Sequence, residues 1–278
     1  MRVLVTGAAG SIGTVVCNGL VDRGYDVLGL DRMVEPEGFT GAWATADCAD
    51  PDAVAAVFDR AMATGGLEAV VHLASIPTEA ALPEILESHV ITTGALLDAM
   101  VEHGVNRIVY ASSNHAVGRT PRRDLLGTDA QPRPDTFYGV GKVAAEALLS
   151  LYVDRYGIDA VAARIGSFLA QPESRRGLST WLSHDDAVRM VDACLTAPAP
   201  GFAVIYGISA NSRAWWDLEP GRALGYHPQD DAEQYAATVE QTPANGDDEV
   251  EARYVGGPYV REKYFRPVLD TNPADSNL

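Results

Sequence analysis

The sequence predicts an α/β protein built on a doubly wound parallel sheet, and three observations support this fold class. Apolar runs of strand length alternate with segments of helical period through the first two-thirds of the chain. A glycine-rich turn joins the first strand to the first helix. The chain is long enough for a full core, with 278 residues of which 47% are hydrophobic and 21% charged. Repeated strand–helix–strand units of this kind form a parallel sheet covered by helices.

Each expected element follows from its local pattern. Short apolar runs bounded by polar or turn residues predict strands at residues 2–6, 26–31, 69–73, 107–112 and 160–164. Apolar residues at helical spacing predict helices at residues 11–23, 51–63, 82–103 and 136–156. Farther along, the pattern predicts a helix at residues 184–196, a strand at residues 203–206 and an aromatic turn at Trp215 and Trp216. The acidic, turn-rich segment 241–249 is expected to be a surface loop.

The charge and the cysteines exclude several classes of function. With 38 acidic and 21 basic residues, the chain has a formal charge of −17 and repels phosphate backbones and anionic lipids, so neither nucleic acid nor a membrane is expected as a partner. Halophilic adaptation is a competing explanation of this acidity. Cys17, Cys48 and Cys194 lack metal-ligand spacing and are expected to be buried thiols, with no disulfide or metal site. No basic leader or long apolar segment is visible, so we expect a cytoplasmic protein.

The turn after the first strand has the form of a dinucleotide-binding site. Gly7, Gly10 and Gly13 stand at G-x-x-G-x-x-G spacing between a strand and an amphipathic helix. Such a turn lets backbone amides at a helix N-terminus approach a pyrophosphate without a Cβ in the way. The second strand ends in Asp31 and Arg32, where a carboxylate would accept the ribose hydroxyls and favour NAD over NADP. The guanidinium could instead accept a 2′-phosphate, but nothing else in the stretch supplies a phosphate pocket.

Two further segments are candidates for the cofactor site. Asp47, followed by Cys48, lies where such folds often contact adenine, although Asp47 could equally be a cap or first-turn acid of the following helix. Leu73, Ala74 and Ser75 end the next predicted strand at the carboxyl edge, where open α/β sheets bind ligands. Together with the glycine-rich turn and Asp31, the predicted cofactor set includes Gly7, Gly10, Ser11, Ile12, Gly13, Asp31, Arg32, Asp47, Cys48, Leu73, Ala74 and Ser75.

A tyrosine and a lysine four residues apart open the helix predicted at residues 136–156. The spacing of Tyr138 and Lys142 puts both side chains on one helix face, one turn apart. A phenol with a pKa of about 10 is a poor base at neutral pH, but a nearby ammonium favours the phenolate and lowers that pKa. An isolated pair of this kind is usually a solvated helix face. Here lysine is scarce, with Lys142 and Lys263 alone among 21 basic residues, so we predict a general base and its partner that also contact the cofactor.

Four hydrogen-bonding side chains stand in the stretch ASSNHAVG, at the end of the strand predicted at residues 107–112. Ser and Asn favour turns and helix N-termini, so a capped turn is one explanation. The other is a catalytic strand tip, in which Ser113 binds the reacting hydroxyl while Asn114 and His115 bind further hydroxyls of a polyol. His115 could instead be a supporting or capping residue.

The chain resembles an extended short-chain dehydrogenase/reductase, and within that superfamily the uronate dehydrogenases. The resemblance covers nearly the whole chain and is carried by TGAAGSIG, ASSNHAVG, RPDTFYGVGK, ARIGSF, LSTWLSHDD, GISANSRAWWD and GGPYV. It implies one Rossmann-like domain over residues 1–278, with NAD bound mainly by residues 1–164 and a small C-terminal substrate-binding elaboration over residues 165–278. It also implies a homo-oligomer that oxidises a hexuronate, such as glucuronate or galacturonate, at its anomeric carbon to an aldarolactone.

The resemblance also implies individual roles. Ser113, Tyr138 and Lys142 would be the catalytic set. The sugar acid would be held by Ser75, Ser113, Asn114, His115, Tyr138, Ser167 and Arg176. Arg176 would bind the carboxylate, because an acidic protein repels an anionic substrate over a Debye length of about 8 Å and needs a local positive charge. A solvated loop is the alternative explanation of the pair at residues 175–176.

Three positions depart from the family pattern. His89 stands where the superfamily usually has an asparagine that helps to hold a proton relay, and Pro77 stands where uronate dehydrogenases have a serine near the sugar. Gly141 replaces the usual serine after Tyr138, at a cost in helix propensity of roughly 0.5 kcal/mol. One lost sugar hydrogen bond changes selectivity by about 10-fold or more.

These departures leave other functions open. A related NAD-dependent aldose or sugar-phosphate dehydrogenase is one alternative, and a sugar epimerase or dehydratase that retains its NAD is another. A dinucleotide-sensing regulatory protein is a third, although it would not need Ser113, Tyr138 and Lys142 together.

Overall fold

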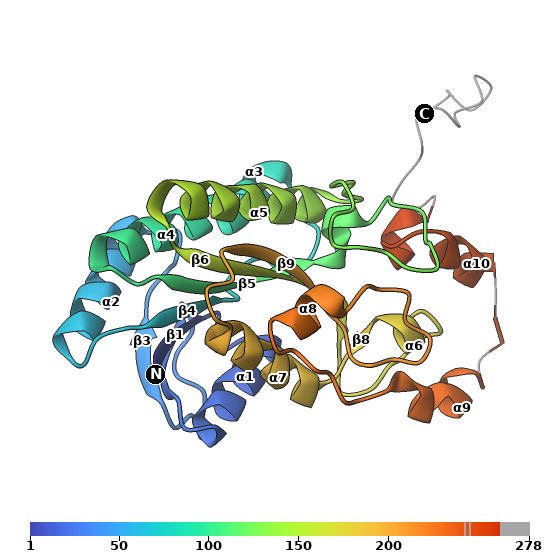
Figure 1. Ribbon diagram of the computed structural model, residues 1–278, viewed down its shortest axis with the longest axis horizontal. Helices are drawn as coiled ribbons and strands as arrows, with labels where there is room; N and C mark the ends of the chain where they lie inside the picture. Colours follow the sequence, from blue (N-terminus) through green and yellow to red (C-terminus); the bar gives the residue numbers. More distant parts are fainter. Residues whose placement is uncertain (242, 245, 262–278) are drawn as a thin grey trace.

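A seven-stranded parallel sheet lies between two layers of helices in the computed structural model, which describes residues 1–241, 243–244 and 246–261 (Figure 1). Every strand pairing in this sheet is parallel. Its strands are β1 (Arg2–Thr6), β2 (Asp26–Asp31), β3 (Ala42–Thr45), β4 (Ala69–His72), β5 (Arg107–Ser113), β6 (Asp159–Ile165) and β9 (Phe202–Gly207). The predicted doubly wound, Rossmann-like sheet is confirmed.

The strand order, β3-β2-β1-β4-β5-β6-β9, reverses direction between β1 and β4. The chain leaves β1 toward one edge of the sheet, and from β4 onward it builds toward the other edge. Open α/β sheets bind ligands in the crevice at the carboxyl ends of the strands flanking such a point. The turn after β1 and the segment after β4, which both belong to the predicted cofactor set, border this crevice.

Helices cover both faces of the sheet because each carries an apolar stripe. One face is covered by α1 (Ser11–Asp22) and α7 (His184–Thr196), and the other by α2 (Pro51–Ala63), α4 (Thr92–His103) and α5 (Phe137–Tyr156) (Figure 1). Alternate strand residues enter the two cores: Val3 and Val5 pack on the first side, Leu4 on the second. Strands buried on both faces have near-continuous apolar runs, which explains why the sequence pattern located them.

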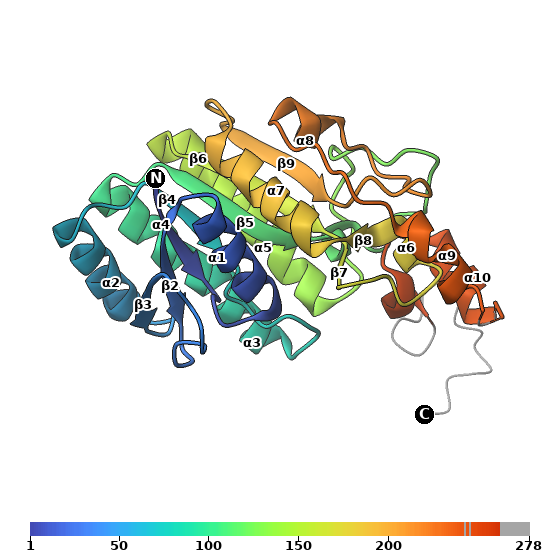
Figure 2. The same ribbon diagram turned by 90° about the horizontal axis from the view of Figure 1, so that it is seen from below.

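Most of the remaining elements gather at the carboxyl end of the sheet (Figure 2). Val255 N donates to Thr120 O (3.1 Å) and Gly256 N to Gly118 O (2.8 Å), so the end of the described chain lies against the loop that follows β5. The elements outside the main sheet and its covering helices that follow β5 are η2 (Asn114–Val117), β7 (Ser167–Phe168), α6 (Gly177–Thr180), β8 (Trp181–Leu182), α8 (Glu219–Ala223), η3 (Ala232–Tyr235), α9 (Ala236–Val239), α10 (Gly246–Arg253) and η4 (Gly257–Val260).

Three details differ from the sequence predictions. The edge strand β3 was not expected, since it is four residues long and only Ala44 is buried. The helix expected at residues 82–103 is divided into α3 (Leu82–Leu86), a π-helical turn η1 (Glu87–Ile91) and α4. The surface loop expected at residues 241–249 is wrong from residue 246, where α10 begins. Turn-forming residues precede α10, and α10 itself has few apolar positions, so the sequence shows no helical period there. Residues 242 and 245 of the expected loop lie outside the described residues.

The three cysteines are buried and unpaired, as predicted. Burial raises the pKa of the Cys17, Cys48 and Cys194 thiols to about 12, which makes them unreactive at neutral pH. In the part of the chain that the structure describes, no helix combines the length and apolarity needed to cross a membrane.

Candidate active site

The glycine-rich turn leaves no space for side chains. Gly7 has φ +70°, and a Cβ there would lie 2.7 Å from Ala74 N; a Cβ on Gly13 would lie 2.1 Å from Gly7 O. Gly10 is the N-cap of α1, which has no side-chain cap and no acidic residue in its first turn. The amides at this helix N-terminus therefore form a cradle of the kind that binds a pyrophosphate.

Asp31 is held beside this turn. Its Oδ2 accepts from Ala9 N (3.0 Å) and its Oδ1 from Met33 N (3.0 Å), which directs the carboxylate across the crevice edge. Arg32 is exposed. Asp47 is also exposed and accepts from Ala49 N (2.9 Å), while Cys48 is buried. The cap of α2 is Asp50, whose carboxylate accepts from the amides of residues 52 and 53, so the alternative of Asp47 as the helix cap is wrong.

Thr6, at the end of β1, fixes the segment after β4. Its hydroxyl accepts from Leu73 N (3.2 Å) and Ala74 N (3.2 Å) and lies 2.8 Å from His72 Nδ1. These bonds hold residues 73–75 against Gly7, and the Ser75 hydroxyl accepts from Lys142 Nζ (3.2 Å). The structure thus places this segment between the glycine-rich turn and the tyrosine–lysine helix.

Tyr138 and Lys142 lie on the inner face of α5, as their spacing predicts. Lys142 Nζ donates to Ala111 O (2.7 Å) and to Ser75 Oγ (3.2 Å) and lies 5.3 Å from the centre of the Tyr138 ring. Lys142 is 2% exposed, and this burial lowers its pKa to about 7 against the opposing charge of Glu146. Burial raises the pKa of Tyr138 to about 12, while a hydrogen bond with Ser113 lowers it. The expected net lowering of the Tyr138 pKa is therefore wrong, because desolvation penalises a phenolate.

Glu146 extends the same face by one more turn. Its Oε1 accepts from Ser112 Oγ (2.5 Å) and Arg164 Nε (3.0 Å), and its Oε2 from Arg164 Nη2 (2.8 Å). The pair is buried, with side chains 7% and 4% exposed. This buried carboxylate faces Lys142 and was missed by the sequence analysis, although the four-residue spacing of Tyr138, Lys142 and Glu146 was visible.

The end of β5 presents the predicted serine, asparagine and histidine. Ser113 caps η2 through His115 N (3.2 Å) and donates to Asn114 Oδ1 (3.2 Å). The capped-turn explanation therefore applies to Ser113, which also hydrogen-bonds Tyr138. His115 is no cap: its Nδ1 donates to the buried Asp135 carboxylate (2.9 Å), which leaves Nε2 available to a ligand.

A cavity of about 160 Å³ lies in front of Tyr138. Glu79 in its wall accepts from Phe137 N (3.0 Å) and Tyr138 N (2.9 Å), so this carboxylate caps the start of α5. Tyr259, from η4, stands edge to face with His115 at 5.0 Å and lies 3.3 Å from the Thr78 hydroxyl. The wall consists of Pro77, Thr78, Glu79, Ser113, Asn114, His115, Thr136, Tyr138, Gly166 and Tyr259.

Ser167 and Arg176 lie beside this cavity and not in its wall. Ser167 Oγ is 2.9 Å from Thr180 Oγ1, which also accepts from Arg176 Nη1 (3.4 Å). Arg176 Nη2 donates to Val255 O (2.6 Å), whereas its Nε is buried with no partner among the described residues. Burial lowers the pKa of Arg176 to about 10. A Cβ on Gly257 would lie 2.2 Å from Arg176 Nε, so the guanidinium packs directly under the backbone that leads to the cavity wall.

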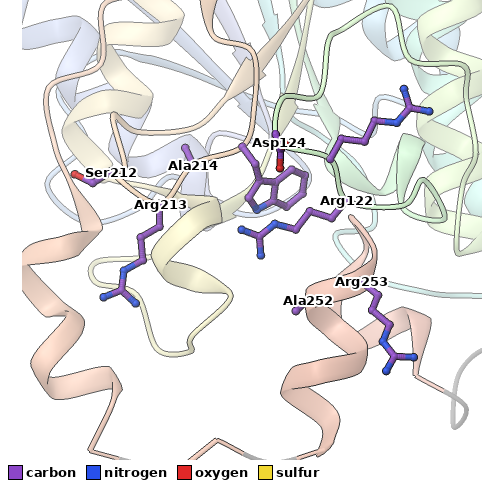
Figure 3. A pocket seen from close by; sticks show the side chains of 9 residues that line it. Arg122, Asp124, Ser212, Arg213, Ala214, Ala252 and Arg253 are labelled. Atoms are coloured by element: carbon purple, nitrogen blue, oxygen red, sulfur yellow. The ribbon is translucent and has the colours of Figure 1, made fainter.

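A larger hollow of about 690 Å³ lies at another place on the surface (Figure 3). Arg122, Arg213 and Arg253 point in different directions in Figure 3, and Arg213 is engaged by Glu233 and Glu240. Since this hollow contains none of the predicted catalytic or binding residues, the candidate active site is the smaller cavity. The hollow is lined by Arg122, Arg123, Asp124, Ser212, Arg213, Ala214, Trp215, Ala252 and Arg253.

Comparison with known proteins places this geometry among NAD-linked enzymes. The model of the NAD dependent epimerase/dehydratase family matches residues 3–184. A uronate dehydrogenase of Pseudomonas putida is 38% identical, over 93% of this chain and 95% of the relative. A crystal structure of a mutant uronate dehydrogenase from Agrobacterium tumefaciens, complexed with NAD, matches with a TM-score of 0.86 at 36% identity, over 96% of this chain and 99% of that one. An NAD-dependent glucose-6-phosphate dehydrogenase of Haloferax volcanii is 35% identical, over 84% of this chain and 95% of the relative.

Proposed function

Because the chain belongs to the NAD dependent epimerase/dehydratase family, we propose that it is a uronate dehydrogenase with Tyr138 as its general base. The family and the relatives make the chain an NAD-dependent oxidoreductase. The proposed reaction is oxidation of the anomeric carbon of glucuronate or galacturonate to an aldarolactone. One observation carries it: Tyr138 borders a cavity shared with Ser113, Asn114 and His115, while Lys142 lies 5.3 Å from its ring.

The turn beside β1 fits a dinucleotide, since Gly7 and Gly13 let its backbone pack at distances that a Cβ would not allow, and no side chain caps α1. When bound there, NAD supplies the acceptor for the hydride that leaves the substrate carbon. The Asp31 carboxylate, anchored by two backbone amides, favours the unphosphorylated ribose of NAD. The pyrophosphate is assigned to Gly10, Ser11, Ile12 and Gly13, and the remainder of the cofactor to Gly7, Asp31, Arg32, Asp47, Cys48, Leu73, Ala74, Ser75, Tyr138 and Lys142.

The proton of the reacting hydroxyl goes to the Tyr138 phenolate oxygen. Burial opposes formation of this phenolate, and two neighbours counteract burial: the Ser113 hydroxyl turns its proton from Asn114 Oδ1 to the phenolate oxygen, and the Lys142 ammonium lies 5.3 Å from the centre of the ring. Glu146 raises the pKa of Lys142 and so helps to keep the ammonium charged. Loss of the hydroxyl proton and of the hydrogen on the same carbon converts C1–OH into the lactone carbonyl, which balances the oxidation.

In this proposal the substrate is held by groups in the segment after β4, at the end of β5 and in the segment after β6. Ser75, Ser113, Asn114, His115 and Ser167 offer hydroxyl, amide and imidazole groups to the sugar. Arg176 binds the carboxylate in this proposal, because it is a part-buried cation beside the cavity whose buried Nε has no partner among the described residues. A buried charge-assisted bond of this kind selects anionic sugars over neutral ones.

A sugar-phosphate dehydrogenase is the second candidate. Similarity to the Haloferax volcanii glucose-6-phosphate dehydrogenase favours it, and the charge of Arg176 suits a phosphate as well as a carboxylate. The uronate is preferred because three uronate dehydrogenases match at 36–38% identity over 93–95% of the chain.

We further propose one domain over residues 1–278, in which residues 1–164 are mainly the NAD-binding core and residues 165–278 are mainly substrate-binding and C-terminal elements. In this proposal the enzyme is a cytoplasmic homo-oligomer that acts on a free sugar acid, without a nucleic acid or membrane partner.

The test is an assay of NADH absorbance with glucuronate, galacturonate, glucose and glucose 6-phosphate, each with NAD and with NADP. Turnover of a uronate with NAD is expected. Faster turnover of glucose 6-phosphate than of either uronate would establish the second candidate instead. Purified protein that retains NAD and interconverts sugars without net NADH formation would indicate an epimerase or dehydratase.

A further inference from the structure

His89 lies in the π-helical turn η1, directly behind the cavity wall. Ile76 N donates to Ser88 Oγ (2.7 Å), and His89 Nε2 donates to Ile76 O (3.1 Å). Both peptide groups that flank Ile76 are therefore bound to the π turn, immediately before the wall residues Pro77, Thr78 and Glu79. Single π-helical turns of this kind often occur at functional sites.

The hydrogen bond to Ile76 determines the tautomer of the His89 ring. A carbonyl oxygen only accepts, so Nε2 carries the proton and Nδ1 carries a lone pair. The side chain is fully buried, and Nδ1 has no partner among the described residues. Burial, with a smaller contribution from the charge of Lys142, lowers the pKa of His89 to about 3. The ring is therefore neutral at working pH and does not exchange protons with the substrate.

The same ring packs against the proposed general base. The His89 and Tyr138 rings meet edge to face, with centroids 5.3 Å apart and an angle of 85°. His115 meets Tyr138 in a similar arrangement, at 5.9 Å and 77°. Edge-to-face contacts are directional, so these two imidazoles restrict rotation of the phenol about its χ angles.

Gly141 is the position on α5 that makes room for this arrangement. A Cβ there would lie 2.6 Å from Ile85 Cγ2 and 3.1 Å from both Cβ and Cγ of His89. A side chain at residue 141 would displace the Ile85 side chain and crowd His89 against α5. The two departures from the family pattern, at residues 89 and 141, are therefore a single packing feature behind Tyr138, whereas Pro77 lies in the cavity wall itself.

We propose that His89 is a positioning residue with two separable actions: its ring orients Tyr138, and its Nε2–H holds the 76–79 wall against the π turn. Gly141 provides the space that both actions require. His89 is fully buried and does not line the cavity, so it acts through its neighbours. The inference rests on the proposed function, since it assigns Tyr138 as the base.

Two substitutions separate the two actions. His89→Gln keeps an N–H that reaches Ile76 O but removes the ring, so kcat should fall about 5- to 10-fold with little change in the KM for the uronate. His89→Phe keeps a ring against Tyr138 but leaves Ile76 O without its donor, so KM should rise about 5- to 10-fold with a smaller change in kcat. His103→Gln, at the far end of α4, is the matched control and should leave kcat and KM unchanged.

The outcomes are decisive in either direction. A fall mainly in kcat for His89→Gln, together with a rise mainly in KM for His89→Phe, supports the proposal. Wild-type values in both variants, or equal losses in both with unchanged melting temperatures, overturn it.

A second measurement does not depend on turnover or on the stability of a variant. ¹⁵N NMR of the wild-type imidazoles should show His89 protonated at Nε2 alone, with no titration over about pH 5 to 8, where an unperturbed histidine titrates. A titrating ring, or a proton on Nδ1, would overturn the positioning role. If no uronate is oxidised, the proposed function fails, and this spectrum still decides how His89 is held.

Discussion

Replacing Glu146 with glutamine should strongly destabilise the fold. Glu146→Gln keeps the shape of the side chain but converts one acceptor oxygen into an N–H₂ group. In the wild-type protein each carboxylate oxygen of Glu146 accepts a hydrogen bond from Arg164, at 3.0 and 2.8 Å, and Oε1 also accepts one from Ser112. An amide in either orientation therefore places a donor against a donor and leaves a buried guanidinium without its counter-charge.

The magnitude follows from the burial of this pair. With side chains 7% and 4% exposed, Glu146 and Arg164 are screened very little by water. Breaking a buried pair by removing one partner costs about 3–5 kcal/mol. At roughly 2–3 °C per kcal/mol for a chain of this length, the melting temperature should fall by about 10 °C. Because Glu146 raises the pKa of Lys142, the substitution should also shift the alkaline limb of the pH–kcat profile to lower pH.

Urea unfolding and thermal melting measure the first effect, and the pH dependence of kcat measures the second. Glu219→Gln is the matched control: it breaks a pair with Arg222 whose side chains are 72% and 44% exposed, and should cost less than about 0.5 kcal/mol. A loss below about 1 kcal/mol in Glu146→Gln would refute the argument from burial. An unchanged pH profile would refute the electrostatic link to Lys142.

Four further predictions concern single residues of the site. Tyr138→Phe should lower kcat by at least about 100-fold while calorimetry finds NAD affinity unchanged, and retained turnover would remove the base assignment. Arg176→Gln should raise the KM for a uronate by about 10- to 100-fold, because the variant loses the cation that binds the carboxylate. An unchanged KM would mean that Arg176 does not bind the substrate. Asp31→Ser should raise turnover with NADP relative to NAD, whereas no change in that ratio would contradict the ribose assignment. The pKa of Lys142 is about 7 in the folded protein and 10.5 in the unfolded chain, so the unfolded chain binds more protons between these pH values and the free energy of unfolding rises with pH. Urea unfolding at pH 7 and pH 9 should therefore show a smaller rise in Lys142→Met than in the wild type. An equal rise in both would contradict the lowered pKa.

The sheet and the glycine-rich turn were predictable because their causes are local. β4 and β6 contain the uninterrupted apolar runs 69–71 and 160–163, which are buried on both faces of the sheet, and Gly7 is required by a positive φ at a single turn. The π turn was not predictable, because one extra residue within 22 hardly disturbs an apolar period of 3.6. The edge strand β3 was missed since it buries one side chain in four.

The site residues likewise include some that local sequence patterns predict and others that they do not. Tyr138 and Lys142 could be paired from their spacing on one helix, whereas Tyr259, Glu79 and Asp135 reach the site through contacts between distant segments that leave no local pattern. The pKa of Tyr138 also could not be predicted from its lysine neighbour, because burial of the phenol is its largest determinant. Arg176 was assigned by resemblance, and the structure places it beside the cavity and not in its wall.

The most direct test of the central claim follows the hydrogen on C1 of glucuronate. With glucuronate deuterated at C1 and unlabelled NAD, the account predicts that deuterium appears in the reduced nicotinamide and that NMR detects an aldarolactone, both lost in Tyr138→Phe. Deuterium that remains on a converted sugar, or a uronate that is not converted at all while a sugar phosphate is, would contradict it.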